Sequence, residues 1–201
     1  MQKLIVATKN KGKLREFREI FQELPFEVIS MEEAGIAGDI EEYGSTFEEN
    51  AMIKAREVAR LTGQMVIADD SGLEVDYLDG APGIYSARFA GEGASDADKN
   101  EKLMGLLQGV PEEKRTARFV CVIAVVLSDA AEFAVRGICE GYIAFQPQGA
   151  NGFGYDPLFY LPEYKMTMAQ VSSEIKNKIS HRGKALKLAV EGLSKRLADI
   201  C

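Results

Sequence analysis

One stretch of the chain decides its fold class: Val66-Ile67-Ala68-Asp69-Asp70-Ser71-Gly72-Leu73-Glu74-Val75. A short apolar run bounded by turn formers is typical of a buried strand. Two acids at the end of such a strand lie where α/β proteins bind ligands, at the carboxyl edge of the sheet. Because neighbouring side chains of an extended chain point in opposite directions, we expect Asp69 and Asp70 to have different roles. The plainer alternative is an Asx-turn that ends the strand, with Gly72 at positive φ.

The periodicity of hydrophobic residues indicates that strands alternate with helices along the rest of the chain. Strands are predicted over 4–7, 26–30, 66–70, 116–127 and 133–139, and the third of them ends at the two acids. Helices are predicted up to residue 24, from 46 to 61, from 95 to 107 and from 181 onward. The strands 116–127 and 133–139 are close enough in sequence to form an antiparallel hairpin. We therefore expect an α/β protein with a mixed β-sheet flanked by helices.

Composition places the chain among ordinary globular proteins. It has 201 residues, of which 46% are hydrophobic and 27% charged, so we expect a single domain over 1–201 that has room for two lobes. A net charge of −7 opposes non-specific nucleic-acid binding. The longest apolar run, 119–127, is too short to span a bilayer as a helix, and the chain opens directly into a strand without a signal-peptide pattern. We expect a cytoplasmic protein with no nucleic-acid or membrane partner.

The first strand runs into a polar, basic loop, Thr8-Lys9-Asn10-Lys11-Gly12-Lys13, and a helix follows. Backbone N–H groups at the start of a helix favour anions, and lysines add positive charge, so this arrangement is typical of a phosphate site. The glycine spacing of a Walker A loop is missing. The alternative is a solvated turn with exposed lysines.

Two acids, Glu41 and Glu42, precede the helix predicted from 46 to 61, and Lys54 lies about two turns into it. Ser45 and Thr46 offer overlapping capping boxes for the start of this helix. Acids at a helix start often only complement its dipole, and Lys54 could be a solvated surface residue. The functional alternative is a second carboxylate for a hard cation such as Mg²⁺, whose preferred ligands are carboxylate oxygens.

Two later segments suggest a ligand with a flat ring. In Phe153-Gly154-Tyr155-Asp156 an aromatic side chain is a candidate for stacking on a nucleobase, and Asp156 for accepting from a ring N–H. The alternative is a tight loop plugged by aromatic side chains. His181 and Arg182 stand at a predicted helix start, where cations are disfavoured unless an anion or a carbonyl oxygen is bound there.

Six segments together resemble one known family, the inosine/xanthosine triphosphate pyrophosphatases. They stand in that family's order and spacing over about residues 3–188: 8–13, 46–51, 68–73, 81–83, 153–157 and 180–183. The resemblance implies a long twisted sheet in two lobes with a central cleft. It also implies Mg²⁺-dependent hydrolysis of ITP, dITP and XTP to the monophosphate and pyrophosphate, by a homodimer.

The same resemblance implies roles for individual residues. Asp70 resembles the general base or water-positioning carboxylate and also a metal ligand. Glu41 resembles the second acidic group at the metal, and Lys54 and Asp69 resemble supporting members of the charged site. The residues implied to bind the triphosphate are Thr8, Lys9, Asn10, Lys11, Gly12, Lys13 and Ser71. Those implied to bind the base are Phe153, Gly154, Tyr155, Asp156, Lys176, His181 and Arg182. His181 or Arg182 would donate to the 6-oxo group of hypoxanthine or xanthine, which adenine lacks.

Two other functional classes compete with this interpretation. A nucleotide-sensing module would keep the phosphate loop and the base pocket without turnover. A phosphatase that forms an aspartyl-phosphate would have two acids one residue apart after its first strand, whereas Asp69 and Asp70 are adjacent and follow a later strand.

Overall fold

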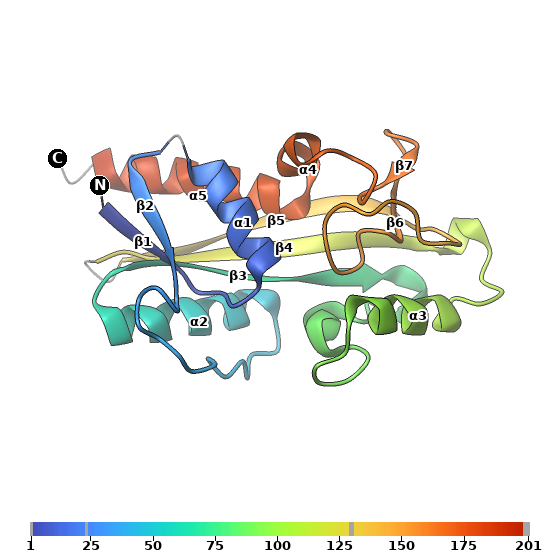
Figure 1. Cartoon of the computed structure of the whole chain (residues 1–201), viewed down its shortest axis with the longest axis horizontal. Coiled ribbons are helices and arrows are strands. Elements are labelled where there is room, and N and C mark those ends of the chain that lie inside the picture. The colour runs from blue at the N-terminus through green and yellow to red at the C-terminus, as the bar shows by residue number, and fades with distance from the viewer. Residues whose placement is uncertain (1, 23, 129–130, 199–201) are drawn as a thin grey trace. The chain divides into compact units, whose positions relative to one another are not determined.

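The computed structural model describes residues 2–22, 24–128 and 131–198 and contains one mixed sheet (Figure 1). In the described part of the chain the sheet has seven strands in the order β2-β1-β3-β4-β5-β6-β7. Their bounds are β1 Gln2–Val6, β2 Phe26–Ser30, β3 Met65–Val75, β4 Thr116–Val126, β5 Glu132–Ile143, β6 Phe159–Leu161 and β7 Met166–Thr167. The helices are α1 Lys11–Phe21, α2 Phe47–Thr62, α3 Asp96–Leu106, α4 Ser173–Ile179 and α5 His181–Ala198, with short 3₁₀ helices at Asp76–Leu78, Gly83–Arg88 and Glu112–Lys114.

Strand directions make the sheet mixed. β1 pairs in parallel with β2 and β3, whereas β6 pairs antiparallel with β5 and β7. The backbone N–H of Leu127 donates to the carbonyl of Ala131 at 2.8 Å and closes the hairpin of β4 and β5. The predicted mixed sheet flanked by helices is therefore confirmed.

The chain divides into two compact units. The first contains residues 1–70, 121–137 and 182–201, and the second contains residues 71–120 and 138–181. That they form the two lobes of one pyrophosphatase domain around a cleft stays a prediction.

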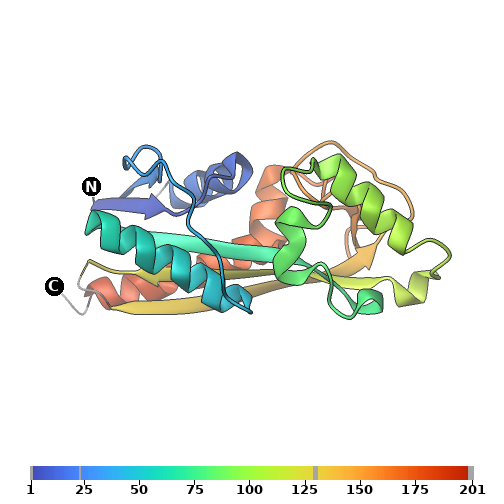
Figure 2. The same cartoon turned by 90° about the horizontal axis from the view of Figure 1, so that it is seen from below.

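The first unit has its core where α1 and α5 cover one face of its strands, while α2 lies on the opposite face (Figures 1 and 2). Its largest fully buried side chains are aromatic or aliphatic and come from α1, β1, β3 and β4: Phe17, Phe21, Leu4, Ile5, Met65, Ile67 and Ile123. The second unit has a separate core, in which Leu103 of α3 and Leu107 just after it form one buried cluster with Leu73, Phe119 and Phe159.

Helix ends follow the local sequence signals in most places. The Thr46 side chain accepts from the backbone N–H of Glu49, the Glu49 carboxylate accepts from the backbone N–H of Thr46, and Gly63 ends α2 in the left-handed conformation. These contacts confirm one of the two predicted capping boxes. α1 ends at Phe21, three residues earlier than predicted, and Pro25 disfavours the helical conformation at the residue before it. The short helix α4 was not predicted.

The structure corrects the prediction that a strand ends at the two acids. β3 continues through Asp69, Asp70 and Ser71 to Val75, and Gly72 is not among the glycines with positive φ, so the Asx-turn alternative is wrong. What ends here is the neighbouring strand: β1 stops at Val6, and the backbone N–H of Ala7 donates to the Ile67 carbonyl at 2.8 Å. The acids therefore lie just past the carboxyl end of β1, in the middle of their own strand.

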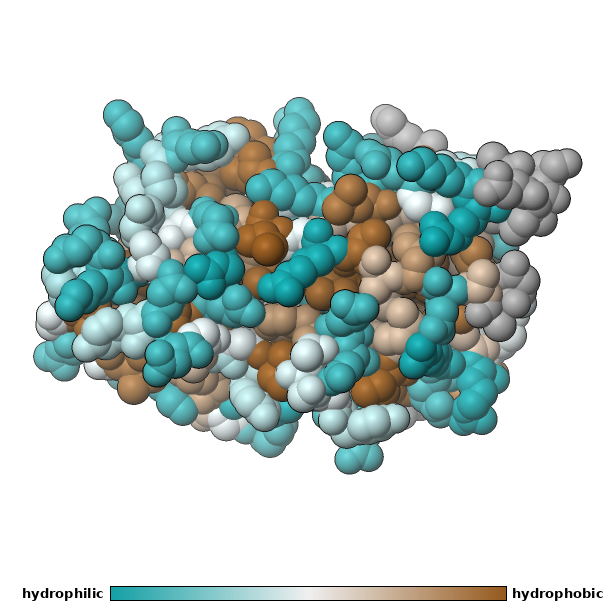
Figure 3. Space-filling model, turned by 180° about the vertical axis from the view of Figure 1, so that it is seen from behind, coloured by the Kyte–Doolittle hydropathy of each residue, from teal (hydrophilic) through white to brown (hydrophobic). Residues whose placement is uncertain are grey.

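The surface mixes hydrophilic and hydrophobic side chains. On the face in Figure 3 hydrophobic residues lie in small groups among hydrophilic ones, which is ordinary for a globular protein. Within the described residues, every helix is too short or too polar to cross a membrane.

Arg115 ties three parts of the second unit together without a carboxylate. It is buried, and its guanidinium donates to the carbonyls of Leu107, Ile143 and Ala144 at 2.7–2.9 Å. Burial lowers the pKa of Arg115, and the carbonyl dipoles take the place of a counter-ion.

We expect Arg115→Ala to lower the free energy of unfolding by about 2–4 kcal/mol, because three carbonyls lose a charged donor. Urea titration followed by circular dichroism measures the change. The control is Lys114→Ala, which removes the same charge from an exposed neighbour and should change stability by less than about 0.5 kcal/mol. Equal effects from both variants would contradict the structural role of Arg115.

Candidate active site

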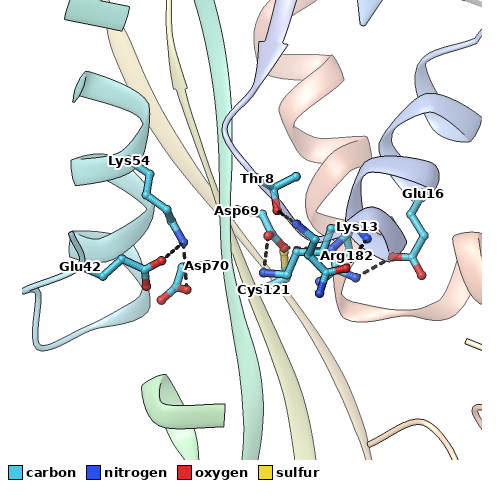
Figure 4. A network of polar contacts seen from close by, with 10 residues as sticks. Thr8, Lys13, Glu16, Glu42, Lys54, Asp69, Asp70, Cys121 and Arg182 are labelled. Atoms are coloured by element: carbon cyan, nitrogen blue, oxygen red, sulfur yellow. Dashed lines mark hydrogen bonds and ion pairs between the residues drawn. The ribbon is translucent and has the colours of Figure 1, made fainter. Parts of the chain in front are cut away.

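The two acids of β3 point to opposite sides of the strand (Figure 4). Asp69 meets Lys13 and Arg182 on one side, and Asp70 meets Lys54 on the other. All five residues belong to the first unit. The alternation of side chains along an extended strand thus gives two separate charged groups from one dipeptide.

On the first side, each carboxylate oxygen of Asp69 lies close to a cation. Lys13 Nζ lies 2.5 Å from its Oδ1, and Arg182 Nε donates to its Oδ2 at 2.9 Å. The thiol of Cys121 lies 3.5 Å from the same Oδ2. Burial alone would raise the pKa of Asp69, but Lys13 and Arg182 outweigh burial and hold the pKa well below its usual value. Asp69 is therefore a permanent anion that fixes two cations.

Arg182 is held from two directions. Its Nη1 donates to Glu16 Oε2 at 2.6 Å, while its Nε donates to Asp69. Both partners and Arg182 itself are buried. Burial opposes the charge, but the two carboxylates raise the pKa of Arg182 above its ordinary value. Glu16 was missed in the sequence. Its signal is a charged residue at an inward position of α1, next to Phe17.

On the second side, Lys54 bridges two carboxylates. Its Nζ donates to Glu42 Oε1 at 2.9 Å and to Asp70 Oδ1 at 3.2 Å. Burial raises the pKa of Asp70 and Glu42 adds to this, while Lys54 and Lys13 lower it, and the net direction is upward. Lys54 is itself buried, but the attraction of Asp70 and Glu42 leaves its pKa raised. Lys54 is thus no solvated surface residue.

The loop that carries Glu42 is anchored to α2. The buried Asn50 accepts from the backbone N–H of Gly44 at 2.8 Å through its Oδ1. A Cβ on Gly44 would lie 2.7 Å from that Oδ1 and from the Cβ of Glu49, so only glycine fits without a shift. The fixed start of α2 and this contact set the position of Glu42 relative to Lys54.

The carboxylates on this side suit a hard cation. Asp70 Oδ2 is buried and accepts no hydrogen bond from the described residues, which leaves a carboxylate oxygen for a ligand. In the described part of the chain no three His, Cys, Asp or Glu residues form a cluster that could hold a metal alone. Mg²⁺ commonly uses only one or two carboxylates and takes its other ligands from phosphates and water. Asp70 and Glu42 fit that mode. Glu41, the predicted ligand, is exposed, while its neighbour Glu42 contacts Lys54.

The predicted phosphate loop is partly helical. Lys11, Gly12 and Lys13 form the first turn of α1, and Asn10 caps it by accepting from the backbone N–H of Lys13 at 3.1 Å. The backbone N–H of Asn10 donates to Thr8 Oγ1 at 3.2 Å. Lys9 turns away to pair with Asp39 at 2.6 Å. The loop therefore presents a helix N-terminus with Lys13 beside it, the arrangement that favours anions.

In the second unit, Phe153, Asp156 and Lys176 form one group. Asp156 Oδ2 accepts from the backbone N–H of Phe153 at 2.9 Å and from Lys176 Nζ at 2.6 Å. The Lys176 ammonium lies 4.6 Å from the centroid of the half-buried Phe153 ring. A Cβ on Gly152 would lie 2.0 Å from Asp156 Oδ2, so the loop closes only with glycine there.

Two other residues predicted to bind the base, Tyr155 and His181, are buried in the second unit. Tyr155 is buried and donates its hydroxyl to the carbonyl of Ser86 at 2.9 Å, and burial raises the pKa of the phenol. His181 is buried and stacks on Phe119 at 4.7 Å between ring centroids. Of the two candidate aromatic residues, Phe153 is thus the half-buried one and Tyr155 the buried one. Ser71 is half-buried in β3.

Fold and site together define an α/β protein whose charged site, with paired lysines and carboxylates beside a helix N-terminus, suits a phosphorylated ligand. Residues 4–192 match the model of the Ham1 family, and the chain belongs to that family. This confirms the resemblance found in the sequence.

Relatives and solved structures are similar over nearly the whole chain. The dITP/XTP pyrophosphatase of Desulforamulus reducens is 52% identical over 96% of both chains, and that of Listeria monocytogenes serotype 4b is 52% identical over 100% of this chain and 97% of the relative. The HAM1 protein of Coxiella burnetii has a TM-score of 0.87 with 43% identity, and the Ham1 protein of Staphylococcus aureus 0.86 with 45%. Each structure covers 97% of this chain and is covered completely.

The environment of Asp70 predicts opposite pKa changes in two variants. Lys54→Met removes a positive charge that stabilises the carboxylate, so the pKa of Asp70 should rise. Glu42→Gln removes a negative charge and should lower it. Carboxyl ¹³C NMR titration of the metal-free protein in EDTA measures both. Shifts of the same sign in the two variants would contradict the geometry in Figure 4.

Proposed function

We propose that this chain hydrolyses nonstandard purine nucleoside triphosphates, namely ITP, dITP and XTP, to the monophosphate and pyrophosphate. Relatives that carry the name dITP/XTP pyrophosphatase at 52% identity support the reaction. The contact of Asp70 with Lys54, which also holds Glu42, is the observation that carries the proposal. It puts a buried carboxylate with a raised pKa beside a cation, which suits proton transfer at a charged substrate.

Asp70 is the proposed general base. Its Oδ1 is oriented by Lys54, and its buried Oδ2 is available to a water molecule or a metal ion. An attacking water would transfer its proton to this carboxylate as its oxygen bonds to phosphorus and the phosphoanhydride bond between the monophosphate and the departing pyrophosphate breaks. A buried carboxylate with a raised pKa is a stronger base than an exposed one. Lys54 keeps Asp70 ionised for this step, and Asp69 holds Lys13 and Arg182 in place.

Charge balance supports a divalent cation. Four carboxylates of the Figure 4 network, Glu16, Glu42, Asp69 and Asp70, outnumber its three cations, Lys13, Lys54 and Arg182. A triphosphate would add about four negative charges to this net negative group. Asp70 and Glu42 would hold Mg²⁺, which when bound neutralises phosphate charge and polarises the phosphoryl group.

Different residues are proposed to bind the triphosphate and the base of the substrate. Thr8 to Lys13 in the first unit and Ser71 in the second are proposed to bind phosphate oxygens, with Lys13 as the main point charge. Phe153 is proposed to stack on the purine ring and Lys176 to border it. We retain Arg182 and His181 as proposed donors to the 6-oxo group. Adenine would present a donor there, and unpaired buried donors discriminate by roughly 10⁴ in well-built sites.

We also propose that the protein is a homodimer, as the family resemblance implies. Its proposed compartment is the cytoplasm, because nucleoside triphosphates are made and used there.

A substrate panel tests the reaction. With Mg²⁺, the protein should release pyrophosphate and monophosphate from ITP, dITP and XTP, and at least about 100-fold less from ATP. EDTA should abolish turnover. Asp70→Asn should lower kcat by about 100-fold or more while nucleotide binding persists, because the shape stays and the base is lost. Nucleotide binding without turnover in the wild-type protein would instead favour the sensing module.

Variants of the two neighbouring glutamates, Glu41 and Glu42, test which of them is the second metal ligand. Glu42→Gln should raise the Mg²⁺ concentration that gives half-maximal rate by about tenfold or more, since a carboxylate ligand is lost. Glu41→Gln removes the same charge one residue away and should leave it within twofold, roughly the effect of an exposed charge. The reverse pattern would return the role to Glu41, as predicted from the sequence.

A further inference from the structure

Two side chains of α3 hold the backbone of a residue in the Phe153 loop. Asp96 Oδ2 accepts from the backbone N–H of Gly154 at 2.6 Å, and Asn100 Nδ2 donates to the backbone carbonyl of the same glycine at 2.9 Å. All these residues lie in the second unit, and Figure 1 shows the loop beside the N-terminal end of α3. Neither α3 residue lies in any motif singled out in the sequence.

The geometry of this contact follows from helix periodicity. Asp96 and Asn100 are four residues apart, so they lie on one face of α3 one turn apart. Ser95 and Asp98 form the capping box that fixes the start of this helix. A pair of side chains on a fixed helix start can bind the donor and the acceptor of one peptide residue at once.

Gly154 needs such a support. Its φ is +63°, which is in the left-handed region, and it sits directly between Phe153 and Tyr155. The hydroxyl of Tyr155 is anchored at Ser86, and the backbone N–H of Phe153 at Asp156. Gly154 is the link between these two anchored residues, and α3 holds it through both of its polar backbone groups. The direction of the Phe153 ring therefore depends on α3.

Charge reinforces the Asp96 contact. Lys99 Nζ lies 2.6 Å from Asp96 Oδ1, on the oxygen that does not face the loop. The hydrogen bonds from Lys99 and Gly154 outweigh partial burial, so the pKa of Asp96 lies below its usual value. At neutral pH the carboxylate is ionised, and hydrogen bonds from N–H groups to ionised acceptors are the stronger kind.

We propose that Asp96 and Asn100 are positioning residues that set the purine-binding position of Phe153. The inference rests on the proposed function, in which Phe153 stacks on the base. Neither residue is assigned a contact with phosphate or metal. Their loss should weaken recognition of the base and leave recognition of the triphosphate unchanged.

Three variants test the pair by hydrogen-bond chemistry. Asn100→Asp is isosteric but places an acceptor against the Gly154 carbonyl. Asp96→Ala removes the acceptor of the Gly154 N–H, whereas Asp96→Asn keeps an amide oxygen that can accept the same bond and should rescue. The matched control is Glu101→Ala, which removes an exposed carboxylate from the same helix.

We expect Asn100→Asp and Asp96→Ala to raise KM for ITP by about tenfold, the effect of losing one good hydrogen bond, with kcat within about twofold. The inhibition constant of tripolyphosphate, which has no base, should stay within about twofold in the same variants. Amide hydrogen exchange at Gly154 should accelerate in Asp96→Ala. Asp96→Asn and Glu101→Ala should resemble the wild type.

Two results would overturn the inference. One is a KM for ITP that is unchanged in Asn100→Asp and Asp96→Ala although exchange at Gly154 accelerates. The other is an equal rise of KM and of the tripolyphosphate inhibition constant, which would mean a general loss of structure. Failure of the proposed function itself would look different, because the wild-type protein would then not turn over ITP. If Asp96→Ala does not fold, the KM for ITP and the tripolyphosphate inhibition constant of Asn100→Asp still decide.

Discussion

The structure of the site depends on burying two adjacent carboxylates in the middle of one strand. An extended backbone sends Asp69 and Asp70 to opposite faces, so one cation cannot serve both. Each acid therefore recruits its own partners: Lys13 and Arg182 for Asp69, and Lys54 for Asp70. As a consequence, the pKa values of these two aspartates are shifted in opposite directions: that of Asp69 is lowered and that of Asp70 is raised. Such divergence fits a permanent anion at Asp69 and the proposed proton acceptor at Asp70.

This burial couples stability to function. Removing one member of a buried ion pair costs about 3–5 kcal/mol, because the remaining charge is left uncompensated. Loss of Arg182 would take one cation away from both Asp69 and Glu16, so an alanine at this position tests folding as much as the proposed base recognition. Isosteric changes such as Asp70→Asn keep the shape of the site and separate the two effects. The negative excess of the network also means that an anionic substrate must bring positive charge with it.

The fold was predictable where a residue's conformation depends on its near neighbours. Thr46 and Glu49 define the start of α2 and Gly63 its end, and apolar periodicity placed most of the strands. The site was predictable down to its motifs but not to every residue. Glu41 and Glu42 carry the same charge one position apart, and only the loop anchored at Asn50 decides which of them meets Lys54. The end of β3 was misplaced because two charges resemble a strand end until their buried partners are known.

Sequence adjacency is a poor guide to shared function in this chain. The boundary between the two units falls between Asp70 and Ser71 and again between His181 and Arg182. His181 stacks on Phe119 in the second unit, whereas Arg182 is bound by carboxylates of the first. A motif such as Ser-His-Arg-Gly therefore joins a packing residue to an ion-pair residue through one peptide bond. A similar argument applies to Phe153 and Tyr155, of which the first is half-buried and the second is buried with its hydroxyl bonded to Ser86. The contacts that position these residues come from helices distant in the sequence, α1 for Arg182 and α3 for the Phe153 loop. No local sequence pattern predicts these contacts.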